Sequence, residues 1–434
     1  MDAWWQCEVP YPFVPQEVIN ATDSVRASLP NRYCDPKVAA DLFEEVIDEF
    51  LLCDDLGLNV LAVEHHAGIN SLLGANPLLV GILARQTRQV RILSLGTLIS
   101  LRKDPVRVAE EYATADVISR GRLEIGFVKS GGTEMASNNA NPVNNIERYW
   151  EAIDLIKKAL SHHDGPFSWE GKHFTHRHVN IWPRPWQQPH PRMWSATGDP
   201  ETAAEVGRRG LVHVLVLRGP EGTKRAYAAH RKARAELGLP KVTTDNFAYA
   251  AFVYVGDTDE EGLRVGSKLL WFLHTSLKSA PQYSRFLPGT APPEAAPQIY
   301  RTAPKPGPGG VLSAGQNAAR LTSLSAEQAM AQGILFAGNP DSVYKQVMDF
   351  YDKVGGFGHL SLVGRSGFMT HAESERASGS SRTKCFRVFA RSNRSRSTDA
   401  GRSASGEARR AILAVRDHPL VDVFAPFQGV TKRV

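Results

Sequence analysis

Short runs of apolar residues alternate along this chain with longer segments in which apolar residues recur every three or four positions. The runs predict buried strands and the longer segments predict helices, because a buried strand is apolar throughout whereas a helix buries one stripe. The runs place eight strands near 3–9, 59–63, 90–95, 122–128, 192–196, 211–217, 247–255 and 359–363.

Several of the predicted helices begin with a polar residue followed by proline, which suits a helix cap and first turn: Asp104-Pro105, Asp199-Pro200 and Asn339-Pro340. The alternation of strands and helices predicts a parallel sheet. Eight such units favour a closed (β/α)8 TIM barrel, and a doubly wound open sheet is the alternative. The helices are predicted at about 37–56, 76–87, 104–118, 144–161, 199–209, 220–237, 257–274 and 339–353.

Two segments interrupt the alternation. Residues 162–191 are rich in His, Pro and Trp, and residues 276–322 are rich in Pro, Gly, Ala and Ser with little apolar periodicity. A loop as long as the second inside a compact domain is usually a lid or a disordered segment. We predict that it is a lid over the active site.

The chain has 434 residues, of which 42% are hydrophobic and 22% charged, as is typical of a globular protein with a large core. Its net charge of +6 comes from residues 377–434, which hold 12 Lys/Arg and 4 Asp/Glu and so leave −2 for residues 1–376. The body of the chain therefore does not have the basic surface that is typical of a nucleic-acid-binding protein.

The location of the protein is predicted from what the sequence lacks. No apolar run reaches the roughly 18 residues of a membrane span, and the first 14 residues do not resemble a signal peptide. The four cysteines form no CxxC pair and are typical of reduced thiols. We therefore expect a cytoplasmic protein.

Glu64-His65-His66 directly follows the second predicted strand. In a barrel this position lies at the C-terminal rim, where active sites form, and imidazole suits proton transfer near neutral pH. His65 and His66 are therefore candidate catalytic residues, and structural histidines at a polar strand end are the alternative. Adjacent side chains on an extended segment point to opposite faces, so the pair does not predict a metal site. No metal is expected either at a second group of histidines without a nearby Asp, Glu or Cys: His173, His176 and His178.

Three further strand ends suit a flat, phosphorylated ligand. Gly96-Thr97-Leu98 permits close approach to the backbone, and residues 129–132 (KSGG) place Lys129 beside consecutive glycine amides. Residues 195–199 (SATGD) offer N–H groups at a helix start. Ordinary turns and caps are the alternative at each. The chain has no nucleophile elbow, P-loop or GxGxxG motif, so hydrolase, triphosphatase and classical dinucleotide-binding functions lack support.

Taken in order, these motifs resemble the bacterial luciferase-like flavin-dependent monooxygenase family. The resemblance runs from about residue 3 to residue 376, and its most specific part extends from residue 104 to residue 123. The matching motifs are Val63-Glu64-His65-His66, Leu95-Gly96-Thr97, residues 104–111 (DPVRVAEE), residues 118–126 (ISRGRLEIG) and Trp194-Ser195-Ala196-Thr197.

The resemblance implies a (β/α)8 barrel, often dimeric, that uses reduced FMN and O2. A separate flavin reductase would supply the reduced FMN, a flavin hydroperoxide would form, and a small organic substrate would be oxidised. His65 would act as the acid or base, and His66 would orient it. Two alternatives stay open: an F420-dependent oxidoreductase of the same superfamily that transfers hydride, and an inactive flavin-binding barrel.

The resemblance also implies which residues contact the cofactor. A non-prolyl cis peptide would lie near Leu98-Ile99, beneath the isoalloxazine ring. Lys129 would contact the phosphate at a position that is usually Arg, without the bidentate fork. Gly198 stands where some members have a hydroxyl, and these two departures leave FMN or another flavin open. The expected binding residues are Gly96, Thr97, Leu98, Lys129, Gly131, Ser195, Thr197 and Gly198.

The tail at 377–434 is Ser/Arg-rich and does not resemble the family's closing helix. In a shifted reading frame, each codon consists of the third base of one residue's codon and the first two bases of the next. With suitable codons for Ala377 to Ala390, this frame encodes VGLFADEVLPRLR, which does resemble that helix. We interpret the tail as a frameshift product, and a genuine disordered basic tail is the alternative. A frameshift would remove the eighth barrel helix and expose apolar surface on the last strand and first helix.

Overall fold

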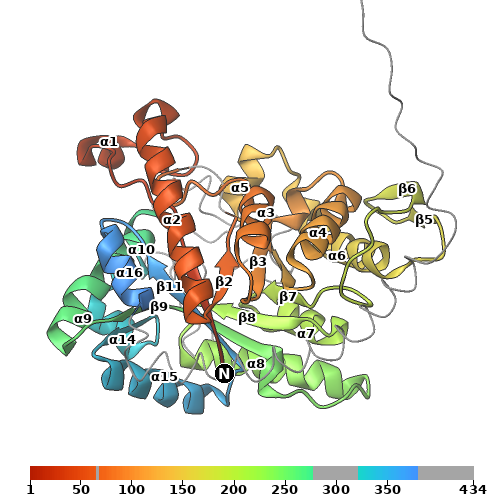
Figure 1. Cartoon of the computed structure of the whole chain (residues 1–434). Helices are drawn as coiled ribbons and strands as arrows, with labels where there is room; N and C mark the ends of the chain where they lie inside the picture. Colours follow the sequence, from red (N-terminus) through yellow and green to blue (C-terminus); the bar gives the residue numbers. More distant parts are fainter. Residues whose placement is uncertain (65–67, 277–320, 380–434) are drawn as a thin grey trace, which may run out of the picture.

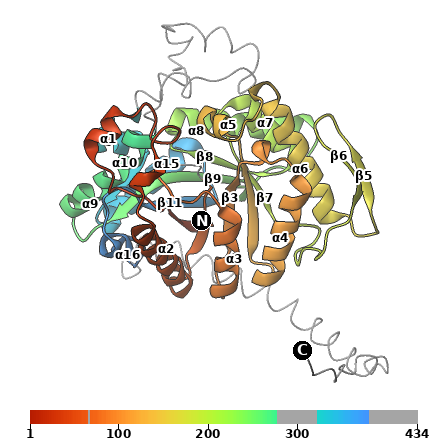
Figure 2. The same ribbon diagram turned by 90° about the horizontal axis from the view of Figure 1, so that it is seen from above.

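Eight parallel strands form a closed barrel in the computed structural model, which describes residues 1–64, 68–276 and 321–379 (Figures 1 and 2). The strands pair in chain order, and the last pairs with the first. All eight predicted strands are present, and the predicted (β/α)8 barrel is confirmed. They are β1 (Asp2–Cys7), β2 (Asn59–Ala62), β3 (Ile92–Thr97), β4 (Leu123–Val128), β7 (Met193–Ala196), β8 (Val212–Val216), β9 (Phe247–Val255) and β11 (His359–Arg365).

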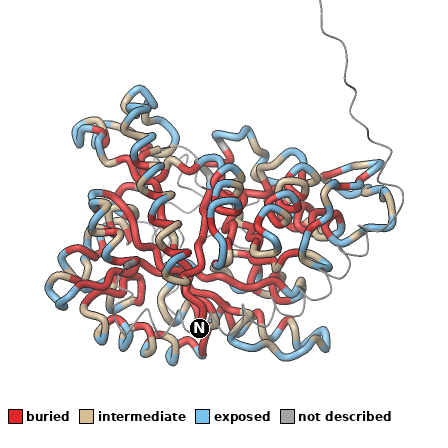
Figure 3. The backbone as a smooth tube through the Cα atoms, in the orientation of Figure 1, coloured by how far each residue is buried: buried red, intermediate tan, exposed pale blue. Residues whose placement is uncertain are grey.

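Helices cover the outside of the barrel, and their buried faces together with the strands form one core (Figure 3). The predicted caps are confirmed: Asp104 accepts the Val106 N–H at 2.9 Å, and Asn339 accepts the Asp341 N–H at 3.0 Å. No helix in the described ranges is long and apolar enough to cross a membrane. The helices are α1 (Gln16–Ala21), α2 (Pro36–Leu56), α3 (Asn76–Gln86), α4 (Pro105–Ser119), α5 (Gly132–Ser137), α6 (Asn145–Ser161), α7 (Pro200–Arg209), α8 (Pro220–Glu236), α9 (Asp259–Gly266), α10 (Trp271–Ser276), α14 (Ala326–Ala331), α15 (Pro340–Val354) and α16 (His371–Gly379).

Three features differ from the predicted pattern. The helix predicted at 257–274 is divided into α9, a 3-10 helix (Ser267–Leu270) and α10. An additional strand, β10 (Leu335–Gly338), pairs with the last four residues of β9. Residues 162–191 contain an antiparallel hairpin of β5 (Phe167–Glu170) and β6 (Thr175–Val179), which lies outside the barrel (Figure 1). The predicted lid, 276–322, falls almost entirely outside the described residues.

A helix, α16, follows β11 within the described residues, although the sequence predicted none at 371–379. Helix α16 packs on α2, β9 and β11. Thr370 starts it, because its hydroxyl accepts the Glu373 N–H at 3.2 Å while Glu373 accepts the Thr370 N–H at 3.0 Å. The proposed frameshift affects residues of which nearly all lie outside the described ranges.

A buried carboxylate, Glu49 on α2, connects the first barrel strand, β1, with the last, β11. Arg365 at the end of β11 pairs with Glu49, and the Cys7 thiol at the end of β1 donates to it at 2.9 Å. Ser374 of α16 donates to the same carboxylate at 2.7 Å. Burial, and then the charge of Glu49, raise the pKa of Cys7 well above its usual value, so the thiol stays protonated and can donate. One fully buried acid therefore joins β1, β11, α2 and α16.

The N-terminal end of the barrel is filled by a plug of charged and aromatic side chains. Arg91 pairs with Asp2 and with Glu124, and its guanidinium lies 4.7 Å from the Trp4 ring centre. Glu124 also accepts the Trp194 indole N–H at 2.6 Å. Because these charges are paired and hydrogen-bonded, they can be buried without the penalty of an isolated ion.

Two histidines stack in the layer between β8 and α8. The rings of His213 and His230 lie 5.6 Å apart with an interplanar angle of 7°, and both residues are fully buried. Burial, the largest cause, lowers the pKa of His213 to about 4 and that of His230 to about 3. The His213 Nε2–H donates to the Thr197 carbonyl at 3.0 Å, which connects this pair to the turn after β7.

We predict that Glu49→Gln destabilises the protein by about 3 kcal/mol, because it leaves the buried Arg365 guanidinium without its main counter-charge. The free energy of unfolding in urea measures this. Glu45→Gln is the matched control: Glu45 also pairs with Arg365, but its side chain is 38% exposed. We expect the control to cost about 1 kcal/mol or less. Equal losses in the two variants would contradict a special role for Glu49.

We predict that acid destabilises the protein through the stacked histidines. Both pKa values are lower in the folded state, so the unfolded chain binds more protons below its own histidine pKa of about 6.5. The stabilisation is complete above that pH and is lost as the pH falls toward 4. His230→Leu should make stability less dependent on pH between 7 and 5, whereas His178→Gln, at an exposed position, should not. Thermal melting at each pH tests this, and identical profiles for both variants would refute it.

Candidate functional site

A cavity of about 220 Å³ lies at the C-terminal end of the barrel. All eight barrel strands contribute to its wall, from the C-terminal half of the strand or the residue that follows it: Gln6, Val63, Gly96, Val128, Ala196, Val216, Phe252 and Val363. Most of the wall is apolar, and Phe272 of α10 and Leu98 complete that part. The charged lining residues are Glu8, Glu64, Lys129 and Glu134. An apolar pocket with a few polar groups at this end of a barrel is typical of a ligand site.

A narrow part of the wall is formed where β3 runs beside β4. A Cβ atom on Gly96 would lie 2.8 Å from the Gly126 carbonyl oxygen, so only glycine fits there. The peptide between Leu95 and Gly96 is cis. This corrects the expectation of a cis peptide at Leu98-Ile99, three residues further along. Gly96 and Leu98 both line the cavity, as expected of residues that lie against a flat ligand.

Two of the expected binding residues point into the helix layer instead. The Thr97 hydroxyl lies 2.6 Å from the Tyr112 hydroxyl on α4, and burial raises the pKa of Tyr112 to about 12. The Ser195 hydroxyl lies 2.7 Å from that of Tyr149 on α6. Successive strand residues face opposite sides of the sheet, which separates Thr97 and Ser195 from their inward-facing neighbours. Neither residue lines the cavity.

Buried ion pairs hold two of the acids on the cavity wall. Glu64 is fully buried, and Arg102 donates to both of its carboxylate oxygens at 2.9 Å. Glu64 directly precedes the predicted catalytic residues His65 and His66, which lie outside the described residues. The ion pair between Arg102 and Glu64 therefore fixes the chain just after β2.

The second acid that lines the cavity is Glu134 on α5. It pairs with Arg26 from the segment between α1 and α2. It also accepts the Gly131 N–H at 2.6 Å. The expected binding residue Gly131 is therefore held by Glu134 at the end of β4, and the amide faces a carboxylate here.

A polar cluster lies where β4 and β7 end. The Lys129 ammonium lies 3.2 Å from the Asp199 carboxylate and 3.1 Å from the Thr202 hydroxyl. Asp199 also caps α7 by accepting the Thr202 N–H at 2.7 Å. Burial alone would raise the pKa of Asp199, but Lys129 and the Thr202 hydrogen bonds outweigh it and lower the pKa. Thr197 belongs to this cluster through its hydroxyl, which donates to Asp199 at 3.3 Å.

A cation that was not predicted from the sequence, Arg218, lies beside this cluster. The Arg218 guanidinium lies against Gly198, where an added Cβ would be 3.3 Å from its Nη1 atom. Lys129 directly follows β4, and Arg218 comes two residues after the end of β8. Lys129 was identified as a cation beside consecutive glycines, a pattern that Arg218 does not share, although Arg218 directly follows the strand predicted at 211–217. The cavity with its glycine-lined wall and the nearby cations fits a flat ligand that carries a phosphate.

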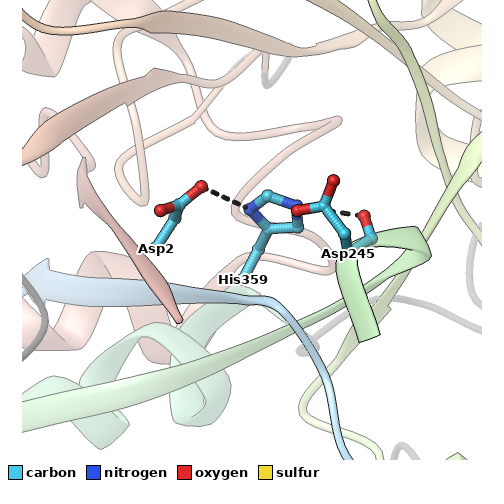
Figure 4. A group of neighbouring side chains, drawn as sticks. All are labelled: Asp2, Asp245 and His359. Carbon is cyan, nitrogen blue, oxygen red and sulfur yellow. Dashed lines mark hydrogen bonds and ion pairs between the residues drawn. The ribbon is translucent and has the colours of Figure 1, made fainter. Parts of the chain in front are cut away.

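One group of described residues brings three possible metal ligands together at the opposite end of the barrel (Figure 4). His359 lies between Asp2 and Asp245, but it presents opposite ring nitrogens to them, 3.5 Å from Asp2 and 3.2 Å from Asp245. A metal ion binds ligand atoms that converge on one point, which this ring does not provide. Each carboxylate also pairs with an arginine, Arg91 or Arg192. We interpret the group as part of the barrel plug.

Comparison with known proteins supports a flavin-related function. The sequence profile of the luciferase-like monooxygenases matches residues 28–356. The oxygenase component of flavin-dependent trigonelline monooxygenase from Acinetobacter baylyi is 30% identical over 237 residues, which are 53% of this chain and 64% of that protein. The alignments with this and two other curated relatives span 46–65% of the relatives' own length.

Solved structures share the fold. The oxygenating constituent of 3,6-diketocamphane monooxygenase from Pseudomonas putida, in complex with FMN, has a TM-score of 0.62 and 18% identity, and the match covers 80% of this chain and 92% of that one. An F420-dependent secondary alcohol dehydrogenase with an F420-acetone adduct has a TM-score of 0.58 and 15% identity, covering 77% and 93%. Proteins of this fold thus use FMN or F420. The profile match extends over more than half of the sequence, and the chain belongs to the luciferase-like monooxygenase family.

Proposed function

We propose that this protein is a flavin-dependent monooxygenase that uses reduced FMN and O2 to oxidise a small organic substrate. The observation that carries the proposal is the rim cavity, in which a glycine-lined wall at Gly96 lies close to a cation, Lys129. The flavin ring would lie along the Gly96 wall, and its phosphate would lie toward Lys129 and Gly198. When bound, reduced FMN supplies the electrons that activate O2.

The protein's own residues would exclude water and move a proton. Apolar side chains such as Val63, Leu98 and Phe252 line the cavity, and a dry site protects reactive species from hydrolysis. His65 would be the acid or base and His66 would orient it. Arg102 would position both by holding the preceding Glu64. The 276–322 segment would close the cavity during turnover.

The proposal includes a separate flavin reductase as a partner, because the relative from Acinetobacter baylyi is the oxygenase component of its enzyme. A second candidate function is hydride transfer with F420. The observation that favours it is the fold shared with the F420-dependent alcohol dehydrogenase, together with the presence of Lys129 where the family usually has Arg. The two candidates differ in whether O2 is consumed.

We also propose that two copies of the chain associate through α2 and α3. A groove between these helices is lined by apolar side chains, including Phe43 and Ile47, and Leu78 on α3 is 71% exposed. Acidic Asp48 and basic Arg85 both line the groove, and a two-fold axis that brings Asp48 of one copy to Arg85 of the other would form that ion pair twice.

We predict that the protein binds reduced FMN and that Lys129→Ala weakens this binding at least about 10-fold, through loss of a charge-assisted phosphate contact. Fluorescence titration with FMN and F420, each oxidised and reduced under anaerobic conditions, measures the affinities. Lys345→Ala is the control, since the Lys345 side chain is 78% exposed on α15 and is not among the residues that line the cavity.

The other results of this titration decide between the alternatives. Tighter binding of F420 without O2 consumption would favour hydride transfer. If no flavin binds, an inactive barrel becomes the better interpretation. An oxygen electrode measures O2 consumption, and His65→Ala should slow it if His65 moves the proton.

The dimer proposal predicts that a charge on the exposed face of α3 separates the two copies. Leu78→Glu should convert a dimer into a monomer, because it places an unpaired carboxylate in an apolar contact. Light scattering after size-exclusion chromatography gives the mass. Leu237→Glu, at a 56% exposed leucine after α8, should leave the mass unchanged. A monomer before any substitution would refute the proposal.

A further inference from the structure

The two sides of the cavity differ in polarity. Strand β9 is the fourth strand after β3 in the eight-stranded ring, so it lies directly across the barrel from the Gly96 wall. The charged lining residues come from the turns after β1, β2 and β4 and from α5. On the far side, the described residues that β8, β9, β11 and the turn after β8 contribute are all apolar. We call them the apolar wall: Val216, Leu217, Ala250, Phe252 and Val363.

Leu217 belongs to this wall because the chain leaves β8 in a left-handed turn. Val216 is the last residue of β8, and both it and Leu217 line the cavity. Successive strand residues face opposite sides, so a continued strand would turn Leu217 away from the cavity. Leu217 instead has a φ of 50°, while its N–H still donates to the Ala250 carbonyl of β9 at 3.0 Å. The turn therefore places two consecutive side chains on the cavity wall.

This backbone conformation is unfavourable for leucine, because at positive φ the Cβ atom crowds the adjoining backbone. Three described residues other than glycine have a positive φ. Arg120 is the cap at the end of α4, where this conformation is common, and Asn139 is of a residue type that tolerates it. Leu217 is large, apolar and only partly buried, so packing in the core offsets less of its strain. Strained residues of this kind occur preferentially at ligand sites.

We propose that the substrate is an uncharged, mainly apolar small molecule that lies between the flavin ring and the apolar wall, and that Leu217 limits its size. This inference rests on the proposed function, in which the flavin lies along Gly96 on the opposite side. An ion against the apolar wall would lose its hydration without gaining a partner, which disfavours charged substrates. The Leu217 side chain occupies space in a cavity of only about 220 Å³, so it restricts what fits beside the flavin.

Four probes test the substrate class on the full chain loaded with oxidised FMN: cyclohexanone, the larger 4-tert-butylcyclohexanone, cyclohexylammonium and cyclohexanecarboxylate. The first, third and fourth share a ring and differ in charge. Saturation-transfer NMR measures each affinity without turnover. We expect cyclohexanone to bind at least about 10-fold more tightly than either ion. Equal affinities for the three would overturn the substrate class.

The size limit is tested with Leu217→Ala. Removing the side chain should raise the affinity for 4-tert-butylcyclohexanone relative to cyclohexanone about 10-fold, because the added methyl groups then find apolar space. FMN affinity should change less than about 2-fold. Leu237→Ala makes the same substitution at a 56% exposed leucine after α8 and should change none of these affinities. An unchanged ratio in Leu217→Ala would refute the role of Leu217.

A stability measurement distinguishes a substrate-binding role from a structural one. Asparagine tolerates positive φ better than leucine does. Leu217→Asn should therefore melt at the same temperature as the unsubstituted chain or higher, while its affinity for cyclohexanone falls about 10-fold because an amide replaces apolar surface. A melting temperature lowered by several degrees would mean that Leu217 serves the fold, and would contradict the proposal.

Failure of this inference and failure of the proposed function give different results. If FMN binds but none of the four probes does, the apolar substrate class is wrong and the proposed function stands. If the unsubstituted chain binds no flavin, both are overturned.

Discussion

The pairing of β11 with β1 converts a row of eight strands into a barrel, and the candidate site depends on that closure. The cavity draws wall residues from every barrel strand, so it exists only when the first and last strands meet. Glu49 strengthens this meeting point because its buried carboxylate binds Arg365 of β11 and the Cys7 thiol of β1. A buried ion pair of this kind contributes little net stability, but an unpaired partner is costly, so the pair favours the closed arrangement over an open one.

Buried ion pairs lie at both ends of the barrel, but only the C-terminal end encloses a cavity. At the N-terminal end, Arg91 pairs with both Asp2 and Glu124, and aromatic rings pack beside them. At the C-terminal end, Glu64 and Glu134 are also paired with arginines, but the space between the strand ends stays open. The filled end supports the barrel, and the open end provides the pocket, as in other barrels of this architecture.

The sequence predicted the fold well because its evidence is local. Each strand is a continuous apolar run, and caps such as Asp104 mark the helix starts, so all eight barrel strands could be located. Strand β10 was missed although residues 334–337 (ILFA) form a short apolar run, because it lies outside the regular alternation of eight strands and eight helices. The helix after β11 was missed because residues 371–379 (HAESERASG) have few apolar residues and so no apolar stripe, although Thr370 is a local start signal.

The candidate site was predicted only in part. Gly96, Leu98 and Lys129 line the cavity, whereas Thr97 and Ser195 face the helices. The two-residue period of a strand would have separated them, but motif matching treated neighbouring residues alike. Arg102 and Arg26 could not be assigned from sequence, because their partners Glu64 and Glu134 are distant along the chain.

The position of Arg365 also has a consequence for the order of events during synthesis. Glu49 leaves the ribosome 316 residues before its partner. At cellular rates of about 5–20 residues per second, this delay is roughly 15–60 s. During that time the nascent chain has an unclosed sheet edge, and the acid that will be buried has no cation. We therefore expect chaperones to bind the incomplete barrel through its unpaired strand edge until the last strand is translated and closes the sheet.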